Sequence, residues 1–441
     1  MQRVKSLNKQ ILQLAIPSIL ANITIPLVGL VDTAIVGHIS DAAAIGGIAV
    51  GGVLFDLLYW NFGFLRVGTS GLTAQAYGEA QSGKDETGTI LVRSLGIAGM
   101  GALLILLLQW VFVTAALAVM PCSAEVAQFA RTYFFIRVWA APATLSLMAL
   151  KGWFIGMQDT VSPMAVDITV NVVNMVVSYV LAVYTPLGAV GVAWGTLVAQ
   201  WSGLVLAAIL LLTRYPERIT GLHVGQILRD IPAMRRLLVL NGNLFLRSLC
   251  MMVVYVGYTA LASRYGDTEL AVSAMMMRLM MLFSYLVDGF AYAGEALVGK
   301  NIGRGEALRP VIRLLFMHAM VLGLVFTVLF GVWGDACMAL LSSDETVLTA
   351  AARYRLWLSM MPILSTLAFM WDGVYAGATA GVKIRNSMIW AALAFVVCYA
   401  LGQHWLGVHA IYLGYMAHLV ARSTYLSSCF SSVFGLSKSA L

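Results

Sequence analysis

The sequence predicts an all-α integral membrane protein with 12 transmembrane helices, arranged as two six-helix lobes. Three observations lead there: an apolar composition, twelve long apolar segments, and an internal repeat. Of the 441 residues, 61% are hydrophobic and only 11% are charged, whereas a soluble domain carries roughly 25% charged residues. A soluble core could not hide this much apolar surface, so the chain belongs to the class of polytopic membrane proteins.

The apolar segments define the predicted helices, because about 20 apolar residues span a bilayer as a helix. We expect spans near residues 11–39, 44–70, 90–119, 126–156, 161–183, 188–213, 236–262, 269–299, 310–332, 350–378, 384–404 and 408–432. The first segment carries Pro17 and Pro26 and lacks a small-residue cleavage site at a suitable distance. We therefore interpret it as a retained helix and not as a signal peptide.

The Lys and Arg residues predict the orientation of these spans. With the N-terminus in the cytoplasm, 17 of the 27 basic residues fall on the cytoplasmic side and four on the outer side. Basic residues concentrate on the cytoplasmic side of membrane proteins, so both termini are expected there. The net charge of +7 has the same origin, and we expect no nucleic-acid partner.

A polar stretch at mid-chain predicts the domain boundary. Residues 213–236 hold five arginines, two prolines and two glycines. We expect an N-lobe over residues 1–213, a cytoplasmic linker over 214–235 and a C-lobe over 236–441.

The two predicted lobes repeat one another in sequence. A shift of 225 places the stretch 71–79 on 296–304, and a shift of 221 places Gly152 and Gly156 on Gly373 and Gly377. Six helices per half is an even number, so the halves form parallel repeats about an axis along the membrane normal. A central cleft between such repeats is the architecture of alternating-access transporters.

Several chemical classes are excluded by missing motifs. The five cysteines form no CxxC pair and the six histidines show no HExxH spacing, which argues against a zinc site or a disulfide framework. No Walker A sequence is present, so ATP is not expected to drive the protein. The longest connection is basic and carries no clustered acid or nucleophile, which disfavours an intramembrane enzyme.

Asp32 is the first candidate functional residue. It follows a run of uncharged residues from Gln10 to Val31, and a carboxylate at the centre of a membrane helix costs about 2.5–3.5 kcal/mol on insertion scales. A chain retains such a group where it faces a partner, a cavity or a proton path. The functional interpretation is a proton carrier, and the alternative is a structural hydrogen bond to a neighbouring helix. Pro26 makes a bend near Asp32 inexpensive.

Other polar residues within the spans are weaker candidates. Asp372 lies in the tenth span and could bind a cation or form a buried pair with Arg. Asn171 and Asn174 share a helix face with Ser178, so they could bind Asp32 or substrate, or join helices. We favour structural roles for Asp56, Asp167 and Asp288. Glu295 is expected to be solvated at a helix end. The further candidates are Asn22 on the first span and Tyr258, whose ring could stack on a cation.

Several motifs resemble the multidrug and toxic compound extrusion (MATE) transporters, with the DNA-damage-inducible branch as the most similar one. The motifs are Val31-Asp32-Thr33-Ala34-Ile35-Val36-Gly37-His38, Gly71-Leu72-Thr73-Ala74-Gln75-Ala76-Tyr77-Gly78, Asp372-Gly373-Val374-Tyr375-Ala376-Gly377-Ala378-Thr379 and Ile384-Arg385-Asn386-Ser387-Met388. The resemblance covers the whole chain. It implies a V-shaped pair of lobes and, for this branch, a proton-coupling role for Asp32. Some members carry a further acid in the sixth helix, where this chain has Gln200.

The resemblance implies a secondary multidrug efflux transporter of a bacterial inner membrane, expected to be monomeric and associated with antibiotic resistance. It would export cationic or amphipathic drugs by proton antiport, with no cofactor beyond the coupling ion and no bound metal. The first alternative is sodium coupling, with Asp372 in an oxygen cage. The second is a flippase for lipids or lipid-linked oligosaccharides, with cleft-lining cations drawn from Arg66, Arg137, Lys151, Arg247, Arg278 and Arg422.

Overall fold

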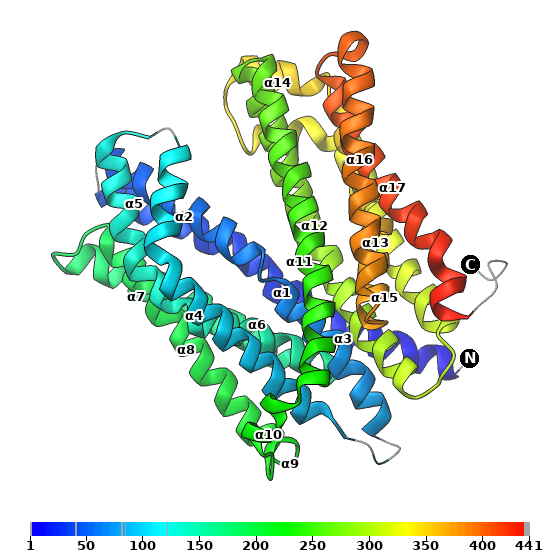
Figure 1. Cartoon of the computed structure of the whole chain (residues 1–441). Helices are drawn as coiled ribbons and strands as arrows, with labels where there is room; N and C mark the ends of the chain where they lie inside the picture. The colour runs from blue at the N-terminus through cyan, green and yellow to red at the C-terminus, as the bar shows by residue number, and fades with distance from the viewer. Residues whose placement is uncertain (1, 40–41, 81–82, 84, 121, 436–441) are drawn as a thin grey trace. The chain divides into compact units, whose positions relative to one another are not determined.

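The computed structural model is helical throughout, with no strand among the residues that it describes, which are 2–39, 42–80, 83, 85–120 and 122–435 (Figure 1). The first part of the chain forms α1 (Gln2–Ile39), α2 (Ala42–Trp60), α3 (Phe64–Glu79), α4 (Thr87–Val119), α5 (Ala124–Arg137), the 3-10 turn η2 (Val138–Ala140), α6 (Ala141–Gly156), α7 (Val161–Tyr184) and α8 (Val190–Arg214). The later part forms α9 (Pro216–Ile219), α10 (Val224–Arg229), α11 (Ile231–Ala262), η3 (Ser263–Tyr265), α12 (Asp267–Gly303), α13 (Arg309–Ala339), α14 (Glu345–Ala352), α15 (Arg355–Gly377), α16 (Gly381–Leu406) and α17 (His409–Phe434).

Each of the twelve predicted apolar segments coincides with helix. Within the described residues, ten helical segments are long and apolar enough to cross a membrane by length and composition. The other two predicted spans correspond to α15 and α17, with 23 and 26 residues. Helices of that length can cross a bilayer, but they are less apolar, since α15 carries Asp372 and α17 carries Arg422 and several serines.

Two predicted spans are broken in their interior where the sequence predicts one continuous helix, and the tenth is broken near its start, between α14 and α15. The second span divides into α2 and α3, because residues 61–63 form tight turns in which Phe62 and Gly63 bond back three residues. The fourth divides at η2, and α6 then begins with a proline in its first turn. Proline lacks the N–H that a helix interior needs, so it marks a helix start.

The described chain divides into two compact units. The first unit holds Leu20–Leu237, and the second holds the chain up to Ile19 together with Leu238–Leu441. These limits differ from the expected lobes, since the first half of α1 groups with the second half of the chain and the expected linker groups with the first. Both limits fall inside continuous helices, α1 and α11.

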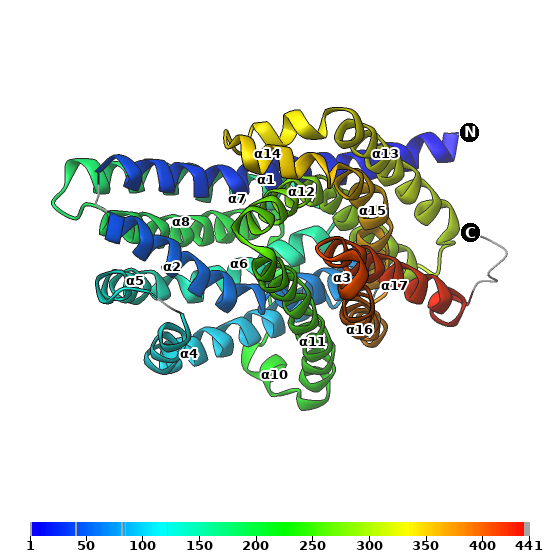
Figure 2. The same ribbon diagram turned by 90° about the horizontal axis from the view of Figure 1, so that it is seen from above.

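The same helix pairs recur in both units. In the first unit α3 and α4 pack on α6, and α7 packs along α8; in the second, α12 and α13 pack on α15, and α16 packs along α17. Within each of the two long pairs the helices run alongside one another in both views: α7 lies along α8, and α16 lies along α17 (Figures 1 and 2). This correspondence supports the predicted duplication at the level of tertiary packing.

Glycines of the predicted repeat mark one close contact in each unit. A Cβ on Gly152 of α6 would lie 2.3 Å from the Arg66 carbonyl oxygen of α3, and a Cβ on Gly373 of α15 would lie 2.4 Å from that of Ala291 of α12. The predicted shift of 225 also relates Arg66 to Ala291. Only glycine allows the two backbones to approach so closely, which explains why both positions hold it.

The helices that carry these glycines, α6 and α15, also end in the same way. Gln158 follows α6 with φ of 65°, and Thr379 follows α15 with φ of 53°. These are the only described non-glycine residues with positive φ, and the predicted shift of 221 places one on the other. Such a left-handed residue is a common way to end a helix, so the repeat extends to the backbone conformation.

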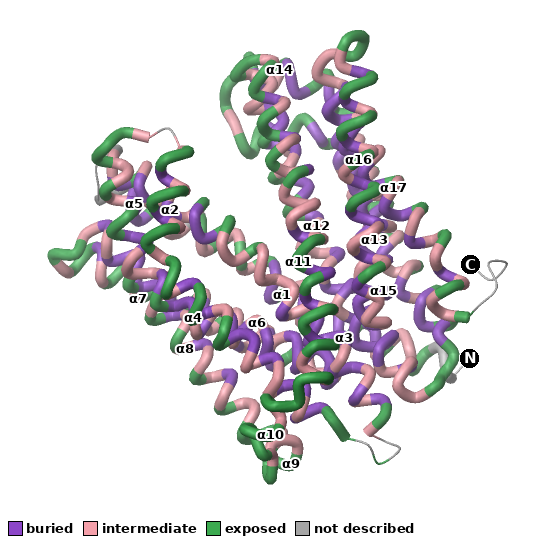
Figure 3. The backbone as a smooth tube through the Cα atoms, in the orientation of Figure 1, coloured by how far each residue is buried: buried purple, intermediate pink, exposed green. Residues whose placement is uncertain are grey.

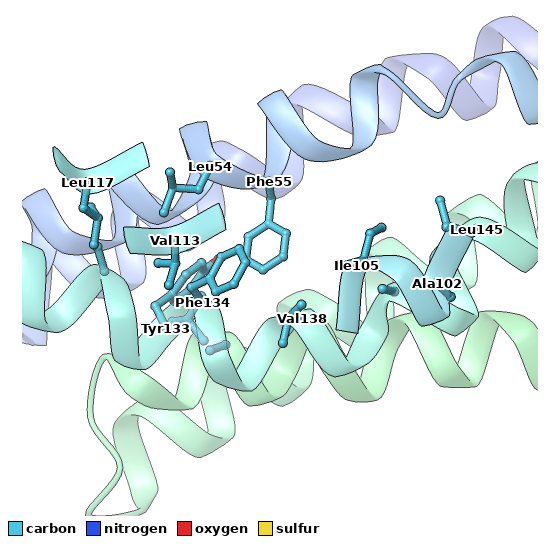
Figure 4. Close-up of a cluster of buried hydrophobic side chains, with 14 of the residues drawn as sticks. Leu54, Phe55, Ala102, Ile105, Val113, Leu117, Tyr133, Phe134, Val138 and Leu145 are labelled. Carbon is cyan, nitrogen blue, oxygen red and sulfur yellow. The ribbon is translucent and has the colours of Figure 1, made fainter. Parts of the chain in front are cut away.

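Apolar side chains fill the interior of each unit and also cover much of the helix surface. In the first unit a cluster around Leu54, Phe55, Val113 and Phe134 joins α2, α4 and α5 (Figure 4). Many exposed side chains of α4, α8, α13 and α16 are Leu, Val, Ile or Trp, and they alternate with buried residues along each helix (Figure 3). An apolar outer surface of this kind suits a lipid environment.

The predicted linker is folded and packs on the first unit. It forms α9 and α10, and Leu228 of α10 lies against Gly96 of α4. Two ion pairs fasten it, one between Arg218 and Asp85 and one between Arg93 and Asp230, the latter with an N–O distance of 2.8 Å.

Candidate functional site

Asp32 lies in the second half of α1, within the unit formed by residues 20–237. The carboxylate is partly buried, and its Oδ1 atom makes no hydrogen bond with any described residue. Arg137, from the end of α5, interacts with it electrostatically. A buried carboxylate oxygen without a donor is costly, so this position suits a group that binds and releases a proton or a cation.

Arg137 is held by aromatic side chains. Its guanidinium carbon lies 4.5 Å from the centre of the Phe55 ring of α2, and its Nη1 donates a hydrogen bond of 3.0 Å to the Tyr133 hydroxyl. Phe55 in turn stacks on Phe134 with 5.0 Å between ring centres, and these rings lie together in the cluster of Figure 4. Cation–π and hydrogen-bond contacts fix the guanidinium where it is.

The polar residues of α7 join helices. Asn171 Nδ2 donates to Thr24 Oγ1 of α1 at 2.5 Å, about two helical turns before Asp32. Asn174 Nδ2 donates to Thr196 Oγ1 of α8 at 3.0 Å. Ser178 faces Gly195 of α8, where a Cβ would lie 2.2 Å from its Oγ. Asn171 therefore fastens the Asp32 half of α1 to α7, while the other two hold α7 against α8.

The remaining sequence-predicted candidates lie on several elements. Asn22 is buried on α1, and Gln200 is partly buried on α8, so both share a unit with Asp32. Tyr258 is buried on α11 in the other unit, where its hydroxyl donates to the Ser273 carbonyl at 3.4 Å. Its ring packs against Tyr412 and Tyr415.

Asp372 is engaged by two arginines. Arg422 of α17 donates from Nε to Oδ1 at 3.1 Å and from Nη2 to Oδ2, and Arg247 of α11 also donates to Oδ2. The Arg422 side chain is 1% exposed and that of Asp372 is 13% exposed. This arrangement is the buried Arg pair that the sequence left open as an alternative.

A polar and aromatic stripe on α17 was not predicted from the sequence, apart from its member Arg422. It consists of His409, Tyr412, Tyr415, His418 and Arg422. The spacing of three or four residues places them on one helix face, and this regularity is the signal that could have revealed them. All but His409 are buried, and Trp357 donates to His409 Nδ1 at 2.8 Å.

One expectation for an acidic residue is wrong. Glu295 was expected to be solvated at a helix end, but it is 3% exposed, because α12 continues to Gly303 and packs against α15 there. Among the described residues no group of three or more His, Cys, Asp or Glu could hold a metal ion.

Comparisons with known proteins identify the family. The MatE family model matches residues 17–180 and 244–402, one stretch in each half of the chain, and the offset between the two stretches is close to that of the predicted repeat. DNA damage-inducible protein F of Escherichia coli is 35% identical over 427 residues, covering 96% of this chain and 92% of that protein.

Solved structures of MATE transporters share the fold. A mutant of the Vibrio cholerae MATE transporter VcmN superposes with a TM-score of 0.89 at 16% identity, covering 98% of this chain and 99% of the other. An outward-facing multidrug resistance MATE family transporter gives 0.84 at 16% identity, covering 98% and 97%. The chain is therefore a multi-pass membrane protein of the MatE family, whose members are transporters and not enzymes.

Proposed function

We propose that this protein is a proton-coupled antiporter that exports organic cations and amphipathic drugs by alternating access, with Asp32 as the proton carrier. The observation that carries the proposal is the Oδ1 atom of Asp32, buried on an apolar helix without a hydrogen bond from any described residue. An ionised Asp32 offers one negative charge to a cationic substrate. A proton from outside would neutralise that charge and favour release of the substrate.

The surroundings of Asp372 support proton coupling over sodium coupling. Sodium needs a cage of oxygen ligands, and oxygen-ligand sites are built from carboxylates and carbonyls that face the ion. Both carboxylate oxygens of Asp372 accept hydrogen bonds from arginine. A sodium ion at Asp372 would have to displace two guanidinium groups, so the C-terminal half offers a poor site there.

The ion pairs also weigh against the flippase alternative. A flippase for anionic headgroups needs cations that are available to phosphate. Of the six cations suggested for that role, Arg247 and Arg422 bind Asp372, and Lys151 binds Asp167 at 2.8 Å. We further propose that the protein works as a monomer in a bacterial inner membrane, with both termini in the cytoplasm.

Ethidium transport into proteoliposomes tests the proposal. The purified protein is given a pH gradient or a sodium gradient of equal size, and dye accumulation is followed by fluorescence. Accumulation should follow the pH gradient and should be lost in Asp32→Asn. Transport driven by sodium alone would favour the sodium alternative, and full proton-driven transport by Asp32→Asn would rule out Asp32 as the carrier.

A further inference from the structure

Arg385 belongs to the motif of residues 384–388, to which the proposed function gives no role. It is partly buried on α16, four residues after that helix begins. Its Nε and Nη2 atoms donate hydrogen bonds to Asn386 Oδ1 at 3.0 and 2.7 Å, and Nη1 donates to Asn243 Oδ1 of α11 at 2.8 Å. Neutral amide groups from two helices therefore hold the guanidinium in place.

The Arg385 guanidinium keeps its full charge and two of its donors in this arrangement. Asn243 Nδ2 donates to the Val239 carbonyl at 2.7 Å, which directs Oδ1 of the same amide at the arginine. An arginine has five N–H donors; three are used, so one remains on each of the two terminal nitrogens. No acid of the described residues forms an ion pair with Arg385, whereas Lys151 pairs with Asp167. The charge of Arg385 is therefore not balanced within this part of the chain.

The fold itself does not need a cation at this position. The predicted shift of 221 places Met164 of α7 on Arg385, and α7 packs along α8 as α16 packs along α17. The same helix pair thus forms in the first unit with an apolar side chain there. A partly buried charge without a counter-ion is costly, so the arginine is suited to bind an anion from outside the chain.

An apolar row of exposed side chains accompanies Arg385 along α16. It consists of Val382, Ile389, Leu393 and Val396, each between 41% and 51% exposed. Steps of three or four residues place all four on the helix face that carries Arg385. Lys383 adds a second positive charge at the same end of the helix. This end of α16 therefore joins a fixed cation to an apolar surface.

We propose that Arg385 and this apolar row bind one anionic phospholipid, with its phosphate on the remaining guanidinium donors and an acyl chain along the row. Arginine binds phosphate oxygens through paired N–H groups. The cytoplasmic leaflet carries anionic lipids, and the start of α16 is expected on that side. Arg385 lies about 6 Å along the helix from its start, so the lipid is a neighbour bound at headgroup level. The site needs neither Asp32 nor proton coupling.

Native mass spectrometry of the purified full-length protein in detergent tests this inference. Phosphatidylglycerol, phosphatidylcholine and inorganic phosphate are titrated separately, and the dissociation constant of the first bound molecule is measured. Phosphatidylglycerol should bind most tightly, because the choline of phosphatidylcholine offsets its phosphate charge. Inorganic phosphate at an equal concentration should not displace phosphatidylglycerol, because it lacks the acyl chains that lie on the apolar row.

Variants at Arg385 and Asn243 separate the guanidinium from general charge. Arg385→Gln should weaken phosphatidylglycerol binding by about tenfold or more, because hydrogen bonds to a charged group are lost. Asn243→Asp keeps the arginine and the shape of the amide but supplies an acid, so it should also weaken binding. Arg313→Gln changes an exposed arginine of the same unit. It removes the same charge and should leave the dissociation constant unchanged.

The apolar row has its own matched pair of variants. Leu393→Ser shortens the row and should weaken phosphatidylglycerol binding, because an acyl chain loses apolar contact there. Leu104→Ser on α4 is the control, because Leu104 is 54% exposed and lies in the first unit, away from the row. It should leave the affinity unchanged.

Each outcome either supports or overturns the lipid site. Lower affinity in Arg385→Gln and Asn243→Asp, with unchanged affinity in Arg313→Gln, supports it. Wild-type affinity in both variants would overturn it, and so would equal binding of phosphatidylcholine. Displacement by inorganic phosphate would identify a free anion as the ligand and overturn the lipid assignment. If Arg385→Gln fails to fold, Asn243→Asp decides, and no readout depends on transport.

Discussion

Asp32 and Asp372 are carboxylates on apolar helices with different surroundings. Asp372 receives hydrogen bonds from Arg247 and Arg422 on both oxygens, whereas the Oδ1 atom of Asp32 receives none from the described residues. A carboxylate that accepts hydrogen bonds from two guanidinium groups joins helices and is stabilised in its charged form. A carboxylate with a free oxygen is better suited to exchange a proton, so we assign the two acids different roles.

Removing the Asp372 charge should destabilise the protein. Asp372→Asn leaves two arginines without their buried counter-ion, and breaking such a pair costs about 3–5 kcal/mol. Thermal unfolding in detergent should show a clear fall in Tm for this variant and little change for Asp32→Asn. Equal Tm values for Asp372→Asn and the wild type would contradict the structural role of Asp372.

The sequence predicted both acids but not their partners. Long apolar flanks make Asp32 and Asp372 conspicuous, because a charge is expensive there. Arg247 and Arg422 lie 125 and 50 residues from Asp372, and Arg137 lies on a helix far along the chain from Asp32. No local pattern encodes such distances, so only the folded chain distinguishes an acid held by two arginines from one with an oxygen that accepts no hydrogen bond from the described residues.

At the scale of the elements, the repeated glycines hold helices close together. Gly373 places α15 against the α12 backbone in the way that Gly152 places α6 against α3. The helix ends at Gln158 and Thr379 follow the same pattern. The α3–α6 contact in one unit and the α12–α15 contact in the other are therefore two copies of the same close packing.

A single methyl group at this contact should be harmful. In Gly373→Ala the new Cβ would lie 2.4 Å from the Ala291 carbonyl oxygen, and overpacking of this kind costs about 1–3 kcal/mol. Gly99→Ala on α4 is the control, because no atom lies within 4 Å of the added Cβ. The control should be neutral or more stable by up to about 1 kcal/mol. Thermal unfolding of both variants measures the difference, and equal stability would refute the close contact.

Hydropathy located the elements better than it located their breaks. The twelve apolar segments match helices within a few residues at most ends, since length and apolarity determine a span. The break at 61–63 and the turn η2 lie inside apolar sequence, where the hydropathy pattern does not change. The linker was recognised by its polarity, but its ion pairs with Asp85 and Arg93 again depend on tertiary contacts.

At the scale of the whole molecule, the distribution of basic residues predicts which side of the membrane each connection faces. The linker holds four arginines at mid-chain, whereas the connection before α14 contains Ser342, Ser343 and Asp344 and no basic residue. Basic loops stay in the cytoplasm. The linker should therefore lie inside and the connection before α14 outside.

Cysteine labelling in intact cells tests this orientation. After the five native cysteines are replaced by alanine, His223→Cys is introduced in the linker and Ser343→Cys before α14, both at exposed positions. A membrane-impermeant maleimide should label Ser343→Cys in intact cells and His223→Cys only after permeabilisation. The reverse pattern would invert the predicted topology.

The most direct test of the central claim is proton release on substrate binding. Ethidium is added to the purified protein in weakly buffered detergent solution at a pH where Asp32 is protonated, and the released protons are measured with a pH indicator. If Asp32 carries the coupling proton, the wild type should release protons as ethidium binds, and Asp32→Asn should release none. Undiminished proton release by Asp32→Asn would contradict the assignment of Asp32 as the proton carrier.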